Sequence, residues 1–269
     1  MARIRYLSVL SQDPNNLAGF YTGHLGMREM GRNADGDISL TDGGMNLTVM
    51  RLRPQLREPR LEQGLHHLGI AVDNIDQTIE RYHRFNPRGV VVRESGDLHH
   101  GEVRIHDPEC NPVTLSQRNF GVTGPEPGAP RIAHIALNAV DTRFVFEFYS
   151  QVFGFRELTQ AHASRMSDPN YRNLHVGDGF TNVAIQQFYN EEEGFEARFG
   201  IAHMGFLVKD SKSLAQSIQG VATITERPAT RQQSEIRMRD PQGNGCDLSQ
   251  RGWEVDVGKW LRADGVQAA

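Results

Sequence analysis

The sequence predicts an α+β protein built from four βαβββ modules. Four segments open alike, each with a short strand-like run of aliphatic and β-branched residues: IRYLSVL at Ile4, LHHLGIAV at Leu65, IAHIALNAV at Ile132 and IAHMGFLV at Ile201. A polar turn and a helix-like stretch follow each opening. Repeats of roughly 60 residues are too long for the common solenoids. One strand, one helix and about three further strands describe each copy better.

The helix ends of the first and third copies support this periodicity. FYTGHLGM, which begins at Phe20, matches FYSQVFGF, which begins at Phe148. Gly26 and Gly154 fall at the same place in the two segments. Because glycine is the usual residue just after a helix, each is expected to be a C-cap.

The second and fourth copies share a different ending. IHDPECNPVTLSQR from Ile105 resembles MRDPQGNGCDLSQR from Met238. An Asp-Pro pair, a few turn residues and a strand-like run predict a hairpin. Each of these copies therefore closes with two paired strands.

The position of the main linker predicts two lobes of two modules each. The clearest linker is GVTGPEPGAP, residues 121–130. We therefore expect an N-terminal lobe over residues 1–120, a C-terminal lobe over 131–251 and a tail over 252–269. The tail contains two large apolar side chains, Trp253 and Trp260. We therefore expect the tail to pack on a lobe or on a partner subunit.

Composition limits the kinds of partner. The 269 residues carry a net charge of −4 and no long basic run, which disfavours nucleic acid and anionic membrane. No apolar run approaches the roughly 20 residues that span a bilayer, and the start is too polar for a signal peptide. Two cysteines suggest no disulfide framework. The expectation is a cytoplasmic protein with a small-molecule partner; homo-oligomer formation stays open.

These features together resemble the vicinal oxygen chelate superfamily. That group includes glyoxalase I, extradiol ring-cleaving dioxygenases and bleomycin resistance proteins. The resemblance covers about residues 4–251 and is carried by FYSQVFGF, HLGIAV, HMGFLV and the hairpin DPQGNGCDL. It implies that modules pair into two cupped, barrel-like mixed sheets, with the first and last strand of each module facing the cup. The fold hosts many chemistries, so it does not name the reaction.

The resemblance also implies a metal site in the C-terminal lobe. Carried over by position, His134, His203 and Asp247 would be the ligands, with Gln186 as a candidate fourth. Two imidazoles and a carboxylate suit one divalent ion; Fe(II) or Mn(II) is favoured, and Zn(II) or Ni(II) is the alternative.

The N-terminal cup would offer a poorer metal site. The corresponding positions are Tyr6, Met50, His67 and Thr114. These residues supply no carboxylate, so we expect any metal to bind in the C-terminal cup alone. A core or substrate-lining role is expected for His67.

The sequence departs from the superfamily pattern at one metal-ligand position and at one catalytic position. Asp247 replaces the usual glutamate, and Arg237 stands where ring-cleaving members carry a tyrosine. An arginine there can bind a carboxylate or phosphate in bidentate fashion. The catalytic acid and base of the ring-cleaving members are therefore not at their usual positions in this sequence. His175 and Tyr171 lie in the same lobe and are the candidates to replace them.

Three functions follow from this pattern. The first is a metal-dependent, extradiol-dioxygenase-like enzyme that chelates two neighbouring oxygens of a catechol-like substrate. The second is a glyoxalase-type lyase, isomerase or epimerase that works through a metal-bound enediolate. The third is a metal-free, resistance-type protein that binds a small molecule. The sequence contains no P-loop, dinucleotide fingerprint or nucleophile elbow.

Overall fold

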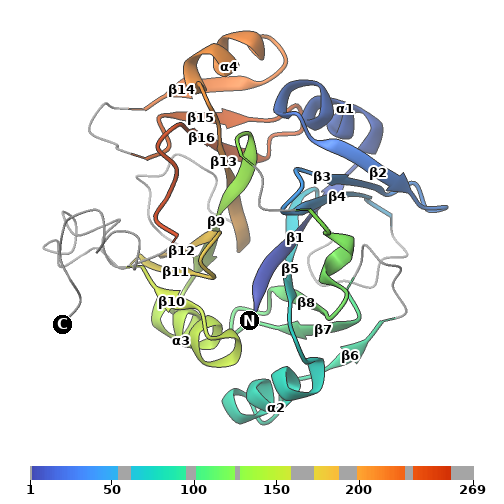
Figure 1. The fold of residues 1–269 in the computed structure, drawn as a ribbon, viewed down its shortest axis with the longest axis vertical. Coiled ribbons are helices and arrows are strands. Elements are labelled where there is room, and N and C mark those ends of the chain that lie inside the picture. Colours follow the sequence, from blue (N-terminus) through green and yellow to red (C-terminus); the bar gives the residue numbers. More distant parts are fainter. Residues whose placement is uncertain are drawn as a thin grey trace, which may run out of the picture.

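The chain folds into two eight-stranded mixed sheets with helices on their outer sides (Figure 1). The computed structural model describes residues 2–53, 62–94, 101–124, 128–158, 173–187, 199–227 and 233–255. The strand orders are β2-β3-β4-β1-β5-β8-β7-β6 and β10-β11-β12-β9-β13-β16-β15-β14. Each sheet joins two modules, and each module runs strand, helix and three strands. The predicted α+β fold of four βαβββ modules in two cupped mixed sheets is thus confirmed.

The first sheet is built from residues 3–116. Its elements are β1 (Arg3–Ser11), α1 (Pro14–Leu25), β2 (Arg28–Arg32), β3 (Ile38–Thr41), β4 (Asn46–Arg51), β5 (Gly64–Ala71), α2 (Ile75–Phe85), β6 (Val92–Arg93), β7 (Val103–His106) and β8 (Pro112–Ser116). A short 3-10 turn, η1 (Asn119–Gly121), follows.

The second sheet is built from residues 131–249 in the same order of elements. They are β9 (Arg131–Ala139), α3 (Thr142–Phe153), β10 (Arg156–Glu157), β11 (Leu174–Gly177), β12 (Asn182–Gln187), β13 (Gly200–Leu207), α4 (Ser211–Ser217), β14 (Thr223–Glu226), β15 (Ile236–Arg239) and β16 (Gly245–Ser249).

Side-chain alternation along the central strands separates two faces of each sheet. In β9, Ile135 and Leu137 join the main hydrophobic core, while His134 and Ala136 point to the opposite side. Helix α3 packs on β9, β11 and β12. Because successive strand residues face opposite sides, the histidine side of β9 is turned away from this helix and forms the cup.

The helix ends follow the local sequence. Asp13, Asn74, Asp141 and Asp210 are the N-caps of the four described helices, and each side chain accepts a hydrogen bond from a main-chain N–H in the first turn. Gly26 and Gly154 end α1 and α3 in the left-handed conformation, as predicted. None of the described helices is long and apolar enough to cross a membrane.

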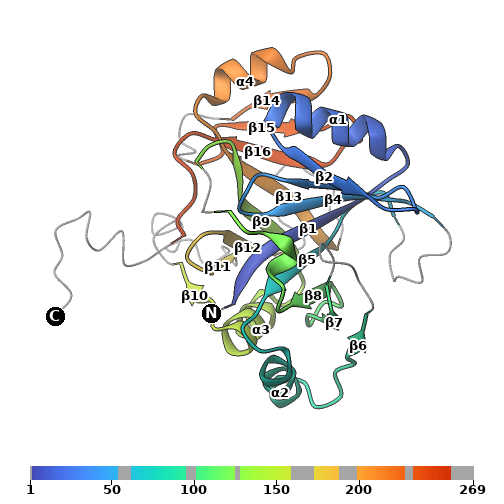
Figure 2. The same cartoon turned by 45° about the vertical axis from the view of Figure 1, so that its right-hand side comes forward.

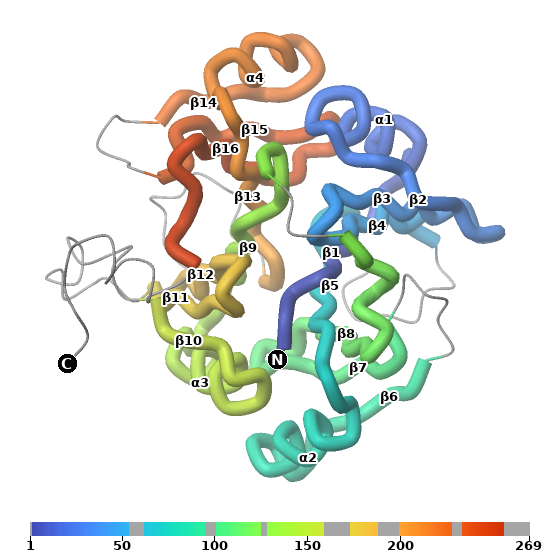
Figure 3. The backbone as a smooth tube through the Cα atoms, viewed as in Figure 1, coloured from blue at the N-terminus to red at the C-terminus, as the bar shows by residue number. Residues whose placement is uncertain are grey.

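The two sheets contact each other through pairs of equivalent residues. The Asp178 carboxylate accepts a hydrogen bond from the Ile4 main chain over 2.7 Å, and Asp42 accepts one from Ile132 over 2.7 Å. Strands β5 and β13 contact each other, and with β1 and β9 they occupy the middle of the molecule (Figure 3).

Helix α1 of the first module lies beside β15 and β16 of the fourth (Figures 1 and 2). There the Tyr21 hydroxyl donates to Asp240 over 2.6 Å. Burial first, and then this contact, raise the pKa of Tyr21. The first and fourth modules are therefore joined by a buried polar contact as well as by packing.

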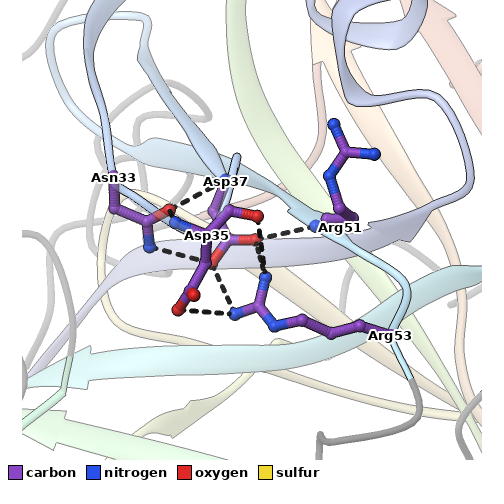
Figure 4. A network of polar contacts seen from close by, with 5 residues as sticks. All are labelled: Asn33, Asp35, Asp37, Arg51 and Arg53. Carbon is purple, nitrogen blue, oxygen red and sulfur yellow. Dashed lines mark hydrogen bonds and ion pairs between the residues drawn. The ribbon is translucent and has the colours of Figure 1, made fainter.

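A polar network fixes the turn between β2 and β3 (Figure 4). The buried Asp37 carboxylate accepts hydrogen bonds from Asn33, from the main chain of Arg51 and from the Arg53 guanidinium, the last over 2.8 Å. Burial by itself would raise the pKa of Asp37, but these hydrogen bonds lower it below its usual value. The network ties the edge of the first sheet to the chain that leaves β4.

Candidate functional site

The register of the second sheet brings the predicted ligands onto one face. Across five neighbouring strands, Asn182, His134, Gly205, Asp247 and Arg237 stand side by side in one row. All but Gly205 carry a polar side chain on the cup side. Since every one of these polar residues is buried, the cup has a polar interior that must satisfy its own hydrogen bonds.

A second row lies next to the first on the same face. It contains His175, Ala184, Ala136 and His203. Between Ile201 and His203 the pairing of β13 with β9 shifts by one residue, which places Ala202 with Ala136 and Ala184 in a small apolar cluster. The imidazoles of His175 and His203 therefore stand at the two ends of an alanine floor.

Asp247 is bound by side chains from three neighbouring positions. Arg237 donates from Nε to Asp247 Oδ1 over 2.9 Å and from Nη2 to Oδ2 over 3.2 Å. Arg227 Nη1 lies 3.4 Å from Oδ2, and so does His203 Nε2. Burial alone would raise the pKa of Asp247, but the neighbouring His203, Arg237 and Arg227 hold it below its usual value. The carboxylate is therefore charged and held from two sides.

His134 is held on its edge and on its face. Its Nδ1 lies 2.9 Å from Asn182 Oδ1. The Trp253 ring stacks on the imidazole with 4.8 Å between centroids and 6° between planes. Gly205 makes this contact available, because a Cβ there would lie 2.5 Å from Trp253. The ring centroid of His203 is 5.3 Å from that of His134.

Two of the three candidate catalytic residues lie in this cup. His175 is buried in β11, with its Nδ1 3.1 Å from Asn182 Oδ1. Arg237 is buried in β15 against Asp247. Tyr171 lies outside the described residues.

Gln186 shares the cup face but not the row of the other candidates. Asp247 pairs with Gly205, two residues after His203 on the neighbouring strand. The equivalent residue of the third module is Ala184, which pairs with Ala136, two residues after His134. Gln186 stands two residues farther along β12. Its place as a fourth ligand remains a prediction.

Sequence reasoning overlooked Asn182 and Arg227, and it expected Trp253 to pack on a lobe or a partner subunit without placing it against His134. Asn182 opens the last strand of its module, but its pairing with His134 depends on long-range register. Trp253 follows the last strand by four residues, and Phe120 follows the end of the second module by a similar distance. That repeated aromatic residue was the signal in the sequence.

The N-terminal cup is arranged differently. Its register pairs Ser8 with Thr48, so Thr48 and not Met50 is equivalent to Ala184. Ser8 Oγ lies 2.6 Å from His67 Nδ1, and Phe120 stacks on Tyr6 at 5.1 Å between centroids. The hydroxyl residues Ser8 and Thr48 stand where the other cup has Ala136 and Ala184.

The donor set of the C-terminal cup fits a divalent ion in its chemistry. Two ligands of one such ion stand roughly 3.0–3.4 Å apart, given bond lengths near 2.1 Å, and His203 Nε2 and Asp247 Oδ2 are separated by 3.4 Å. His134 comes from the neighbouring strand on the same face. Within the described parts of the chain, no three His, Cys, Asp or Glu side chains already converge on one point.

Comparisons with known proteins agree with this architecture. Residues 131–248 match the model of the Glyoxalase/Bleomycin resistance protein/Dioxygenase superfamily. The matched residues lie in the C-terminal lobe and make up less than half of the chain, and their similarity to that superfamily agrees with the resemblance seen in the sequence. No curated protein sequence is similar enough to count as a match.

Solved structures share the fold over nearly the whole chain. The 2,3-dioxygenase LapB from Pseudomonas sp. KL28 superposes with a TM-score of 0.67 at 14% identity, over 95% of this chain and 94% of that one. The Mn(II)-bound glyoxalase from Novosphingobium aromaticivorans superposes with a TM-score of 0.69 at 16% identity, over 96% of this chain and 86% of that one. A mutant 4-hydroxymandelate synthase from Streptomyces coelicolor superposes with a TM-score of 0.62 at 15% identity, over 94% of each chain. At these identities the likeness shows the fold alone.

Proposed function

We propose that the chain is a metal-dependent enzyme that acts on a small substrate with two neighbouring oxygens, bound in the C-terminal cup. The proposal is supported by the placement of His134, His203 and Asp247 on one sheet face. The distance of 3.4 Å between His203 Nε2 and Asp247 Oδ2 suits two ligands of one ion. Fe(II) or Mn(II) is the favoured ion, with Zn(II) or Ni(II) as the alternative. A bound ion would act as a Lewis acid on the two substrate oxygens.

The residues of the chain would do the positioning. Arg237 binds both oxygens of Asp247 and would fix the orientation of that carboxylate. Asn182 and Trp253 fix the ring of His134. The small side chains of the alanine floor lie beside His203. Among the reactions open to such a site, we favour extradiol-dioxygenase-like chemistry on a catechol-like substrate, with glyoxalase-type isomerisation as the alternative.

The test is metal content, compared between the two cups. The purified protein is dialysed against Fe(II) or Mn(II) and then against metal-free buffer, and bound metal is measured by mass spectrometry. His203→Ala should lose most of the metal and stay folded, while the matched variant His67→Ala in the other cup should keep it. Full retention in His203→Ala would contradict the site. Oxygen uptake with catechol then separates ring cleavage from isomerisation.

A second function is favoured by one observation. The two arginines on Asp247 already neutralise the carboxylate that a dication would need, and a third positive group close by is disfavoured. This arrangement suits a metal-free protein that binds a small molecule. Absence of metal from the wild-type protein after dialysis, together with binding of a catechol probe, would establish that function in place of the first.

A further inference from the structure

The amide of Asn182 has only one orientation that satisfies its surroundings. Its Nδ2 donates to the main-chain oxygen of Glu254 over 2.8 Å, and a carbonyl oxygen can only accept. The amide nitrogen must therefore face Glu254, and Oδ1 must face the two imidazoles. Asn182 is fully buried, so bulk solvent does not offer an alternative partner.

This orientation determines the protons on both histidines. Oδ1 lies 2.9 Å from His134 Nδ1 and 3.1 Å from His175 Nδ1. An amide oxygen can only accept, so each Nδ1 must carry the hydrogen. In a neutral imidazole the lone pair then lies on Nε2. That lone pair is what metal ligation requires of His134 and what proton acceptance requires of His175.

The same contacts tie the histidines to the segment after the last strand. Glu254, which holds the Asn182 amide, directly follows Trp253, which stacks on His134. The short segment thus restrains the His134 ring twice, once through its face and once through the amide that binds its edge. Leaving Gly205 without a side chain makes room for this segment.

The N-terminal cup contains an internal comparison. Asn46 occupies the equivalent place: it pairs with Tyr6 as Asn182 pairs with His134, and its Nδ2 donates to the Phe120 main chain over 2.6 Å. No imidazole occupies either equivalent position there, since Tyr6 and Ser39 replace His134 and His175. The link between the asparagine and the chain after the last module is therefore common to both lobes, and only the C-terminal lobe adds histidines to it.

We infer that Asn182 is the positioning residue of the C-terminal cup: it sets His134 and His175 as Nδ1–H tautomers and links both to the Trp253–Glu254 segment. This inference deepens the proposed function, but the tautomers exist whether or not a metal binds. Removal of a residue that hydrogen-bonds the second ring nitrogen of a ligand histidine typically lowers metal affinity by about 10–100-fold.

The test measures the tautomers directly on metal-free protein. Two-bond ¹H–¹⁵N correlation spectra of protein labelled with ¹⁵N-histidine distinguish a protonated from an unprotonated ring nitrogen, and His134→Gln and His175→Gln assign the signals. Above the pH at which the imidazoles are neutral, the wild-type protein should show protonated Nδ1 and bare Nε2 for both residues. A protonated Nε2 in either one would overturn the inference, and this result needs no variant.

Three variants then separate positioning from simple support of the fold. Asn182→Leu should shift His134 and His175 toward the Nε2–H tautomer. Asn182→Asp should keep Nδ1–H, since a carboxylate still accepts, although it cannot donate to Glu254. Asn46→Leu loses the matched hydrogen bond of the other lobe and should leave both tautomers unchanged. Unchanged Nδ1–H signals in Asn182→Leu, or altered ones in Asn46→Leu, would refute the positioning role.

A metal titration of the same proteins distinguishes this inference from the proposed function. If the protein binds Mn(II), affinity should fall about 10–100-fold in Asn182→Leu and stay unchanged in Asn46→Leu. If it binds none, the proposed metal enzyme fails while the tautomer result stands by itself. If it binds Mn(II) with equal affinity in the wild-type protein and Asn182→Leu, the positioning role is wrong although the metal site is right.

Discussion

Gly205→Ala should displace Trp253 from His134 and destabilise the C-terminal lobe. A Cβ at this position would lie 2.5 Å from Trp253 and 2.8 Å from His134 Cβ. Opposed Cβ atoms in paired strands normally stand about 4.5–5.5 Å apart, so both neighbours must move. Overpacking of this kind costs about 1–3 kcal/mol. For a chain of this size that corresponds to a fall in Tm of about 2–12 °C.

The assay combines thermal unfolding with tryptophan fluorescence. The sequence has two tryptophans, so Trp260→Phe leaves Trp253 as the single reporter. In that background Gly205→Ala should lower Tm and shift the Trp253 emission toward that of a more exposed indole. Gly69→Ala is the matched variant: its Cβ would lie 2.6 Å from Phe120 and 2.8 Å from Tyr6 Cβ. It should lower Tm similarly and leave the emission unchanged.

Gly19→Ala provides a control for the substitution itself. Nothing lies within 4 Å of a Cβ at this helical position, so the change should raise stability by about 0.5–1 kcal/mol. If Gly205→Ala instead keeps both the wild-type Tm and the wild-type emission, then the close packing of Trp253 on the second sheet is wrong. An emission change in Gly69→Ala would show that the two lobes are not independent in this respect.

Three further variants test buried charges. Burial raises the pKa of Asp107 to about 6; a raised pKa stabilises the protonated folded state, so this contribution is present at low pH and is lost as pH rises through about 6. Asp107→Asn should remove this pH-dependent contribution, which amounts to ~1.4 kcal/mol for each unit by which the pKa is raised. Denaturant unfolding between pH 4.5 and 7.5 should then show a free energy of unfolding that changes less with pH than that of the wild-type protein. Asp37→Ala should cost about 1–3 kcal/mol because the turn loses its buried acceptor and the Arg53 guanidinium keeps only Asp35, and an unchanged urea midpoint would contradict the network. Arg237→Met should cost about 3–5 kcal/mol by leaving Asp247 with fewer cations, and the double variant with Asp247→Asn should recover part of that loss in the same unfolding assay.

Much of the architecture is encoded in local patterns. The strand openings, the helix-ending glycines and the Asp-Pro hairpins each depend on a few adjacent residues, so they can be recognised without knowledge of distant contacts. The alternation of His134 with Ile135 and of His203 with Met204 likewise predicts which residues face the cup and which face the helices. The two histidines and Asp247 were named as candidate ligands by the superfamily resemblance, which this alternation supports.

Register and the partners of charged groups required the tertiary structure. A shift of two residues along a strand keeps a side chain on the same face, so no local pattern distinguishes Gln186 from Ala184. The pairing of Arg237 with Asp247, and of Asn182 with His134, depends on hydrogen bonds between strands far apart in the sequence. Alternation along each strand therefore determined which side chains enter the cup, while long-range strand pairing decided which of them meet, because only the folded sheet brings those strands together.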